Sequence, residues 1–441
     1  MTPTTIGLVM FAAMLGLMAL RIPIAAAMFI PGAVGYWAMT NELALLNMLK
    51  GSAVARLTVY DLSVIPLFLL MGQFATQGGL SRALFKAAAA FIGHIKGGLG
   101  MAAIMAAAGF GAVCGSSVAT TATIGQVAYP EMKSHGYSGR LSTGVLATGG
   151  SLGILIPPSV PLVVYAILTE QNIAKLFAAA FIPGLIAMFG YIVVIYIYCR
   201  VRPDLATASE PTPWAQRWKA LVAVWPIATI FIMVFGGIYA GIFTPTEGAA
   251  VGAIGTFIAG LASRELGLEG IKRSFLGTAE TSAMVFMIFL GADMMNSALA
   301  LTQLPANLAD WVSHLQVPPL AIVATLLAFY VVLCCVMDEL SMLLLTIPVV
   351  FPAIMGLDLF GLDMQEKAIW FGILVLMIVQ IGLITPPVGL NVYVVNSVCK
   401  DVPMSETYRG VLPFLLSDFL RVALLLFFPV VTLGVVRWLF P

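Results

Sequence analysis

Long apolar segments, separated by short polar turns, fill almost the whole chain. Most are close to the ~20 residues that a helix needs to cross a bilayer. The first half predicts membrane spans at 5–20, 24–39, 57–78 and 173–198, an amphipathic arm at 82–94, a hairpin at 97–130 and a broken helix at 141–168. The second half predicts spans at 221–241, 246–262, 278–301 and 411–439, an arm at 304–315, a hairpin at 318–355 and a broken helix at 369–398.

The two halves match over several stretches. Pro23 corresponds to Pro245 at an offset of 222, and Ile156-Pro-Pro158 corresponds to Thr385-Pro-Pro387 at an offset of 229. Self-similarity at a nearly fixed offset is the signature of an internal repeat. We therefore predict a first repeat at 1–200 with scaffold spans within 5–80, a cytoplasmic linker at 201–219, and a second repeat at 220–441 with scaffold spans within 221–301.

Both predicted broken helices contain a glycine-rich stretch with two adjacent prolines, GGSLGILIPPS at 149–159 and QIGLITPPVGL at 380–390. Adjacent prolines remove two backbone donors, and broken backbone survives in hydrocarbon only where protein buries it or where it lines a polar cavity. Matching breaks in two half-chains indicate a transport site; a kink that serves packing alone is the alternative. The residues concerned are Gly149, Gly150, Gly153, Ile156, Pro157 and Ser159 in the first break, and Gly382, Thr385, Pro386, Gly389 and Asn391 in the second.

The first predicted hairpin has a polar centre, which favours a turn at mid-membrane. Cys114-Gly-Ser-Ser117 supplies hydroxyls and a flexible Gly115, so Ser116 and Ser117 are candidates to bind a small hard cation or a carboxylate. The alternative is that hydroxyls bond to the carbonyl four residues earlier in their own helix. We expect that second behaviour for the threonines of this hairpin, Thr120, Thr121 and Thr123.

The second predicted hairpin carries two acids at the equivalent place. A carboxylate inside a membrane is costly and usually faces a transport pathway, so Asp338 is a candidate to bind a cation. The alternative is a hairpin tip that reaches interfacial water. Glu339 is a weaker candidate, because adjacent residues rarely face the same way.

Composition and charge support an all-α polytopic membrane protein. Hydrophobic residues make up 61% and charged residues 9% of the 441 residues, whereas soluble domains carry about 25% charge. The net charge of +1 and the lack of a basic run give no reason to expect a nucleic-acid partner.

The distribution of positive charge predicts the topology. Suppose that each hairpin leaves the membrane on the face from which it entered. Fifteen Lys and Arg residues then share the cytoplasmic face, five lie on the other face and Arg421 lies within a span. This distribution satisfies the positive-inside rule. The two repeats are then inverted, with both termini outside. The fifteen are Arg21, Arg82, Lys86, Lys96, Lys133, Arg140, Arg200, Arg202, Arg217, Lys219, Arg264, Lys272, Arg273, Lys400 and Arg409.

Other polar residues within apolar segments have competing explanations. Thr244-Pro-Thr-Glu247 is typical of a helix N-terminus with an acid in its first turn. Asp418 and Arg421, three residues apart, are expected to pair with each other. Asp293 is a candidate to support the site from behind. Gln380 and Asn396 either line the cavity or form hydrogen bonds with neighbouring polar groups.

At these residues the sequence resembles the large membrane subunit, of the DctM type, of tripartite ATP-independent periplasmic (TRAP) transporters. The resemblance covers nearly the whole chain. The matching stretches are GGLGMAAIMAAAGFGAVCGSSVATTATIG, GYSGRLSTGVLATGGSLGILIPPSVPLVVYA, GGIYAGIFTPTEGAAVGA, IGLITPPVGLNVYVV and RGVLPFLLSD. The resemblance implies an elevator-type secondary transporter, in which hairpins and broken helices slide as one unit against a scaffold of the other spans.

The resemblance also implies two or more sodium ions, each held between a hairpin tip and its broken helix. No Arg or Lys falls at the inferred site, so an anionic substrate would be held by helix ends, hydroxyls and bound cations. Because family members often carry Ser where this chain has Cys114, the resemblance supports the backbone carbonyl there as a ligand rather than the side chain. Carried over, the first sodium site comprises Cys114, Gly115, Ser116, Gly150, Gly153, Ile156 and Pro157; the second comprises Asp338, Gly382, Thr385 and Pro386; the substrate would contact Ser116, Ser117, Ser159, Asp338 and Asn391.

The partners that the family implies are a small four-span membrane subunit of the DctQ type and a periplasmic solute-binding protein of the DctP type. The protein is then expected in a bacterial inner membrane, importing a C4-dicarboxylate or a similar carboxylate. A stand-alone sodium–dicarboxylate symporter and a passive channel are alternatives. An intramembrane enzyme that uses Ser116 is another, but it needs a nearby base, and His94, His135 and His314 fall near span ends.

Overall fold

The structure is a computed structural model that describes residues 2–314, 316–335 and 337–440. Residues 1 and 441 at the ends of the predicted repeats, 315 in the predicted second arm and 336 in the predicted second hairpin lie outside the described residues. Within the described residues the regular structure is entirely helical. Six helical segments are long and apolar enough to cross a membrane, or seven if α3 and α4, bent by 57° at their junction, count as one span. The chain is therefore the all-α, polytopic protein that its sequence predicts.

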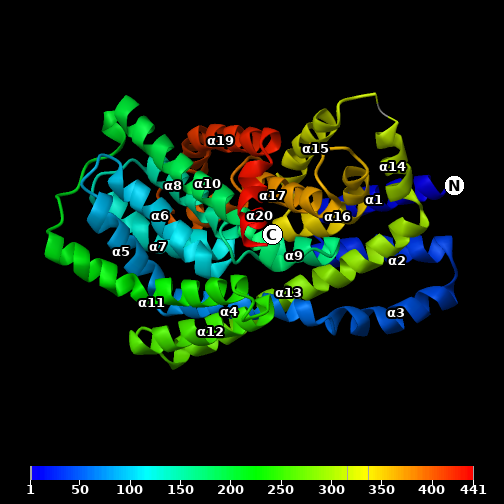
Figure 1. The fold of residues 1–441 in the computed structure, drawn as a ribbon, viewed down its shortest axis with the longest axis horizontal. Helices are drawn as coiled ribbons and strands as arrows, with labels where there is room; N and C mark the ends of the chain where they lie inside the picture. Colours follow the sequence, from blue (N-terminus) through cyan, green and yellow to red (C-terminus); the bar gives the residue numbers. More distant parts are fainter. Residues whose placement is uncertain (1, 315, 336, 441) are drawn as a thin grey trace.

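The helices follow the predicted order in both halves (Figure 1). The first half comprises α1 (Pro3–Ala19), α2 (Ile24–Met39), α3 (Glu42–Leu57), η1 (Tyr60–Ser63), α4 (Val64–Gln77), α5 (Leu80–Ile92), α6 (Gly98–Cys114), α7 (Ser117–Ser134), α8 (Gly139–Leu155), α9 (Val160–Thr169) and α10 (Ile173–Val201). The second half comprises η2 (Pro203–Leu205), α11 (Trp214–Tyr239), α12 (Pro245–Ala262), α13 (Leu268–Leu301), α14 (Leu304–Ser313), α15 (Pro319–Cys334), α16 (Glu339–Met355), α17 (Met364–Gly382), α18 (Leu390–Val398), α19 (Met404–Phe427) and α20 (Val430–Leu439).

Local sequence chemistry explains where these helices start and stop. Helix α8 ends at Leu155 and α9 begins at Val160, so the first proline pair lies in the gap, and the second pair lies in the gap between α17 and α18. Helix α12 begins with a capping box, in which the Thr244 hydroxyl accepts from the Glu247 amide while the Glu247 carboxylate accepts from the Thr244 amide. Both breaks and the N-terminus of α12 lie where the sequence predicts them.

Several helix boundaries differ from the predicted ones; α11, for example, begins at Trp214, inside the predicted linker at 201–219. Helix α3 was not expected, because Lys50 and Arg56 interrupt its apolar pattern; Asn41 caps its start. Helix α13 begins at Leu268, ten residues before the predicted span, since its first turns are polar but still helical. The last predicted span is two helices, α19 and α20, because the chain bends at Phe428-Pro429.

The second and third spans of the two halves pack reciprocally. Helix α2 packs along α13, and α12 packs along α4, so each half contributes its second span to the third span of the other. Small residues bring α2 and α13 together. An ideal Cβ built on Gly32 would lie 2.7 Å from the Met295 amide nitrogen, and Gly291 lies against the Ala25 carbonyl. In Figure 1, α3, α4, α11, α12 and α13 form one layer along the lower edge of the molecule.

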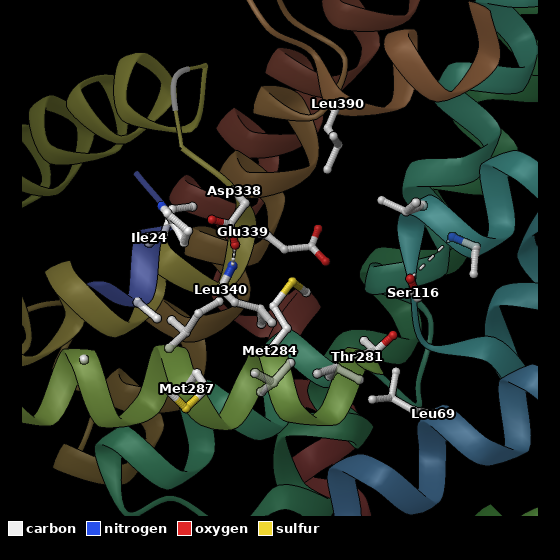
Figure 2. A pocket seen from close by; sticks show the side chains of 18 of the residues that line it. Ile24, Leu69, Ser116, Thr281, Met284, Met287, Asp338, Glu339, Leu340 and Leu390 are labelled. Carbon is white, nitrogen blue, oxygen red and sulfur yellow. Dashed lines mark hydrogen bonds between the residues drawn. The ribbon is translucent and has the colours of Figure 1, made fainter. Parts of the chain in front are cut away.

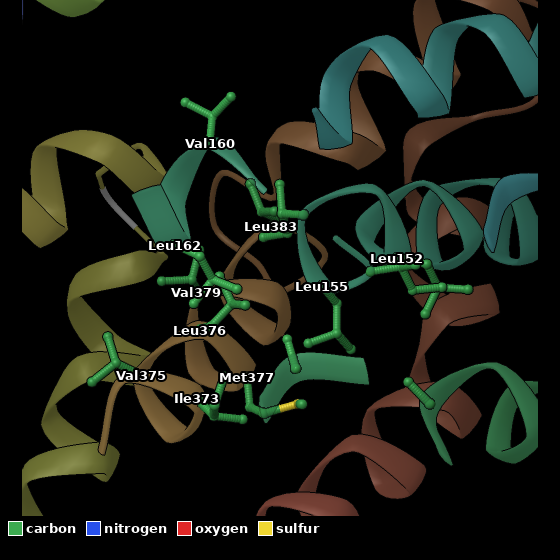
Figure 3. Close-up of a cluster of buried hydrophobic side chains, with 14 of the residues drawn as sticks. Leu152, Leu155, Val160, Leu162, Ile373, Val375, Leu376, Met377, Val379 and Leu383 are labelled. Atoms are coloured by element: carbon green, nitrogen blue, oxygen red, sulfur yellow. The ribbon is translucent and has the colours of Figure 1, made fainter. Parts of the chain in front are cut away.

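The hairpins and broken helices form the other layer, above the first in Figure 1. Residues 141–155 of α8 and 368–382 of α17 are buried on every side, which is typical of helices inside a protein rather than facing lipid. Figure 3 shows part of this core, in which Leu152 and Leu155 of α8 belong to one cluster of buried apolar side chains with Leu376, Val379 and Leu383. The first break is thus embedded in a dense apolar environment.

Candidate functional site

A cavity of about 1090 Å³ lies between the two hairpin tips and the helices α2, α4 and α13. Ser116 lines it from the first tip, and Asp338 and Glu339 line it from the second (Figure 2). Leu69 of α4 and Met284 and Met287 of α13 form the opposite wall. The cavity therefore separates the hairpin layer from the layer of α2, α4 and α13, and its polar groups come chiefly from the hairpin tips.

The first tip is a tight turn between α6 and α7. Helix α6 ends at Cys114, and Gly115 takes a left-handed conformation with φ of +67°, which a residue with a side chain adopts only at a cost. The Ser116 hydroxyl then caps α7 by accepting from the Ala119 amide at 3.4 Å. Capping uses the hydroxyl of Ser116, and its carbonyl accepts from the Thr120 amide at 3.1 Å, which leaves one lone pair of that oxygen for another partner.

The first tip packs directly on the first break. A Cβ built on Gly153 would lie 2.7 Å from the Ser116 carbonyl oxygen and would also collide with the Thr120 hydroxyl. The Val160 amide, at the start of α9, donates to the Gly115 carbonyl at 3.5 Å. The Thr120 hydroxyl is buried and has no hydrogen-bond partner among the described residues. A backbone carbonyl and an orphaned hydroxyl thus meet beside unwound helix, the donor set that such sites offer to small cations.

The second tip holds a carboxylate with one unused oxygen. Asp338 caps α16 through Oδ2, which accepts from the Leu340 and Ser341 amides at 3.2 Å each. Its Oδ1 is buried and lacks a hydrogen-bond partner among the described residues, as does the hydroxyl of Ser341. A buried, unpartnered carboxylate oxygen is costly to leave unsatisfied, so this arrangement suits a cation. Capping of α16 is the structural role of Asp338 that competes with ion binding.

The two tips contact each other. The Ser117 hydroxyl donates to Glu339 Oε2 at 3.2 Å, which joins α7 to α16. Glu339 also lines the cavity beside Asp338. The expectation that these adjacent acids face different ways is wrong, because Asp338 lies before the first turn of α16 and points back over it.

The second break differs from the first in exposure. An ideal Cβ built on Gly382 would lie 2.9 Å from the Cys334 carbonyl oxygen at the end of α15, so this break also contacts its own hairpin. The Thr385 hydroxyl donates to the Ile381 carbonyl at 2.6 Å, and Pro386 is exposed. Residues 151–160 around the first break are all buried.

The remaining predicted residues lie behind the cavity wall. Ser159 caps α9 at the Leu162 amide at 3.4 Å, and the Asn391 side chain donates to the Ala147 carbonyl at 3.2 Å. Ile156 packs on Gly184 of α10, and Gly150 packs on Thr121. Among the predicted residues, the cavity lining comprises Cys114, Gly115, Ser116 and Asp338; the others, set back from it, are Ser117, Gly150, Gly153, Ile156, Pro157, Ser159, Gly382, Thr385, Pro386 and Asn391.

Cys114 marks the contact between the first tip and α4. A Cβ on Gly72 would lie 2.8 Å from the Cys114 carbonyl oxygen and 3.1 Å from its sulfur. The absence of a side chain at Gly72 therefore lets the tip lie against α4.

One site feature was missed from the sequence. Arg21, in the turn between α1 and α2, lines the cavity, although no Arg or Lys was expected there. The sequence feature that could have revealed Arg21 is the Arg21-Ile-Pro interruption between two apolar spans.

Asp293 does not support the site: it forms an ion pair with Arg56 of α3, within the layer of α3 and α13. Asn396 also satisfies neighbours, donating to the Val392 carbonyl and the Thr407 hydroxyl.

A buried polar network ties the broken helices to α10 and α19. Gln380 donates to the Ser151 hydroxyl at 3.0 Å and to the Tyr191 hydroxyl at 2.8 Å, and its carbonyl accepts from Arg421 at 2.9 Å. Arg421 and Tyr191 both donate to Asp418 Oδ1 at 2.7 Å. The predicted pairing of Asp418 with Arg421 is confirmed, and Gln380 satisfies neighbours rather than lining the cavity.

Comparisons with known proteins give a family model and close relatives. The model of the DctM component of tripartite ATP-independent periplasmic transporters matches residues 11–431. The C4-dicarboxylate TRAP transporter large permease protein DctM of Pseudomonas aeruginosa is 36% identical over 86% of this chain and 87% of its own. The sialic acid TRAP transporter large permease protein SiaM of Vibrio cholerae is 30% identical over 91% of this chain and 92% of its own. The solved YdaH transporter of Alcanivorax borkumensis, at 16% identity, has a similar fold, with a TM-score of 0.62 over 97% of this chain and 98% of its own.

Proposed function

Since the chain belongs to the DctM family of TRAP transporter large permease subunits, we propose that it couples the import of an organic acid anion to sodium by an elevator motion. Membership of this family makes it a transporter subunit and not an enzyme. The proposal concerns the ions, the substrate class and the motion.

One observation carries the proposal: both hairpin tips and helices of the other layer line a single cavity. Ser116 and Asp338, at equivalent places in the two halves, face the same space. A substrate in this cavity would contact both moving tips and the facing helices at once. Movement of the tips relative to α2, α4 and α13 would then carry the substrate across the membrane.

The charges of the cavity support coupling to cations. Asp338 and Glu339 line it together, and Arg21 contributes one positive charge. Two like charges about 4 Å apart repel by about 4 kcal/mol at the effective dielectric constant of a protein surface, so an anion does not enter beside two carboxylates without compensation. Sodium bound at Asp338 Oδ1, and at the Ser116 carbonyl with the Thr120 hydroxyl, would supply it. Anion binding would then require sodium binding, which is reciprocal coupling.

The packing supports a sliding motion. The contact of Cys114 with Gly72 is made by backbone and small groups, without interlocking side chains. The two hairpins are joined by the Ser117–Glu339 hydrogen bond, and the two broken helices by the Ser151–Gln380 hydrogen bond. A unit that is cohesive within and meets α4 through small groups is suited to move as a rigid body. The hydrogen bond from Asn296 of α13 to the Leu344 carbonyl of α16, at 3.3 Å, is a contact that such a motion would break.

The substrate is proposed to be a C4-dicarboxylate or a similar carboxylate, because the P. aeruginosa relative carries that name. The family is tripartite, so a small membrane subunit and a periplasmic binding protein accompany the large permease. We place the complex in a bacterial inner membrane, in keeping with a periplasmic partner.

The proposal is tested by uptake into proteoliposomes that contain the large and small membrane subunits. Radiolabelled C4-dicarboxylates are supplied with the cognate binding protein, under a sodium gradient or an equal potassium gradient. We expect uptake only with both sodium and the binding protein, and loss of sodium dependence in Asp338→Ala and in Thr120→Val, which removes the hydroxyl assigned to the first ion. Uptake that is equal in potassium contradicts sodium coupling.

A stand-alone sodium–dicarboxylate symporter is the second candidate, favoured only by the shared fold with transporters outside the family. Sodium-driven uptake of free substrate at full rate without the binding protein would establish it instead.

A further inference from the structure

A second cavity, of about 840 Å³, lies on the side of the molecule away from the hairpin tips. It is enclosed by the start of α5, by α11 and by the C-terminal half of α12. In Figure 1 these helices lie at the lower left, apart from the site of Figure 2. None of its lining residues belongs to a hairpin tip or to a helix break.

The floor and the walls of this groove have different side chains. Small residues form the floor, including Gly78, Gly255 and Ala259. Trp225, Met233 and Ile258 border it and are 62%, 41% and 59% exposed. Trp225 and Met233 belong to α11, which is long and apolar enough to cross a membrane, and Ile258 belongs to a span predicted from the sequence, so we infer that the groove opens toward the lipid.

One end of the groove is basic. Arg82 and Lys86 of α5 and Lys219 of α11 line it, with a single opposing acid, Glu265. Arg82 lies 3.7 Å from Glu265, and both side chains are half exposed, so this weak pair neutralises at most one positive charge. Within the described residues, neither Lys86 nor Lys219 makes an ion pair. The end of the groove therefore keeps a net positive charge of two.

We propose that this groove binds an anionic phospholipid, with its phosphate between Lys86 and Lys219 and an acyl chain along the small-residue floor between α11 and α12. Basic residues at one end and apolar walls at the other match the two ends of such a lipid. The three basic residues lie on the predicted cytoplasmic face, where anionic lipids attract them at about 1 kcal/mol per charge. A free phosphate would use the basic end and leave the apolar length without a partner.

The position of the groove gives the lipid a structural consequence. Gly79, with φ of +72°, joins α4 to α5 at its edge, and α5 leads directly into the first hairpin. A bound lipid contacts both sides of this junction, α5 on one side and α11 and α12 on the other. It therefore stabilises the connection between the two layers.

The test compares lipid retention by the purified chain, with and without the small subunit. Protein is exchanged into detergent, equilibrated with phosphatidylglycerol or phosphatidylcholine, and measured by native mass spectrometry. We expect one retained phosphatidylglycerol, and about 30-fold weaker retention in Lys86→Gln/Lys219→Gln, from about fivefold per lysine. The matched control is Lys272→Gln/Arg273→Gln, which removes two charges from the same predicted face outside the groove and leaves retention unchanged.

Three results overturn the proposal. Equal retention in the groove variant and the control means that surface charge alone attracts the lipid. Displacement by soluble glycerol phosphate at the same concentration as the lipid means a phosphate site. Loss of the lipid on adding the small subunit, with cross-links from Trp225→Cys to that subunit, means that the groove is a protein interface.

Discussion

Ser117 donates a hydrogen bond to Glu339 over 3.2 Å, and the two residues are 222 positions apart, the offset that relates the two halves of the sequence. Ser151 and Gln380, which hydrogen bond at 3.0 Å, are 229 positions apart, the offset of the two breaks. Equivalent residues of two copies contact each other only near the axis that relates them. We infer from these pairs, and from the reciprocal packing of α2 with α13 and α4 with α12, that an approximate two-fold axis passes through the hairpin layer.

The Ser117–Glu339 contact yields the first prediction. Glu339→Gln keeps an acceptor for Ser117 but removes the charge, so we expect at least a tenfold weaker apparent sodium affinity in proteoliposome uptake. Ser117→Ala removes one hydrogen bond to a charged group, worth about 1.5 kcal/mol, and we expect about a tenfold effect or less. In the double variant the two effects do not add. Full additivity would mean that the two side chains act independently.

Gly153 yields the second prediction. Gly153→Ala places a methyl group 2.7 Å from the Ser116 carbonyl oxygen and against Thr120, so it pushes the first tip away from the first break. Sodium at 100 times its Kd adds about 2.7 kcal/mol to the free energy of unfolding of a protein that binds one ion, and so raises its Tm. We expect the variant to lose this sodium-dependent rise in Tm. Gly434→Ala is the control, since its methyl group meets nothing within 4 Å. An unchanged sodium-dependent Tm in Gly153→Ala removes the first break from the ion site.

The buried network yields the third prediction. Arg421→Met leaves Asp418 buried without its main cationic partner and is expected to cost about 3–5 kcal/mol of unfolding free energy. The double variant Asp418→Leu/Arg421→Met removes both charges and is expected to be more stable than the single variant. Arg437→Met, which breaks the surface pair with Glu366, should cost less than about 1 kcal/mol. Denaturant unfolding in detergent gives all three values; equal loss in the single and double variants would contradict a charge-based role.

The fourth prediction concerns pH. Lys133 and Tyr129 of α7 each donate to Asp401 at 2.7 Å, and these contacts hold the pKa of the Asp401 carboxyl below its usual value. A lowered folded-state pKa means that this contact stabilises the fold above the ordinary aspartate pKa of roughly 3.9 and is lost as the pH falls through the lowered value. We expect the stability difference between the wild type and Asp401→Asn to be constant from pH 5 to 7 and to shrink in stronger acid. A difference that grows on acidification would reverse the sign of this linkage.

Local chemistry made much of the fold predictable. Proline and glycine act on their own backbone, so both breaks follow from the sequence around Pro157 and Pro386. The capping box at Thr244 and the pairing of Asp418 with Arg421 depend on residues three positions apart. Such features need no knowledge of which helices become neighbours.

Long-range partner choice could not be predicted in the same way. Asp293 pairs with Arg56 across 237 positions, and Arg56 lies on a helix that the apolar pattern did not reveal. Arg21 looked like a surface charge at the end of a span, yet it lines the cavity because α1 and α2 turn beside the second tip. Gln380 could equally have faced the cavity, and its role followed only once Ser151, Tyr191 and Arg421 lay within reach.

The most direct test of the account is sodium binding by Asp338→Asn. Asparagine caps a helix as well as aspartate does, so this variant keeps the start of α16 intact and removes only the charge. Binding of radioactive sodium to the purified wild-type and variant proteins is measured at equilibrium, with Glu265→Gln as a control for loss of an acid outside the cavity. We predict that Asp338→Asn loses one sodium ion per chain while its Tm without sodium is unchanged. Retention of the full complement of sodium, at wild-type affinity, would contradict the account.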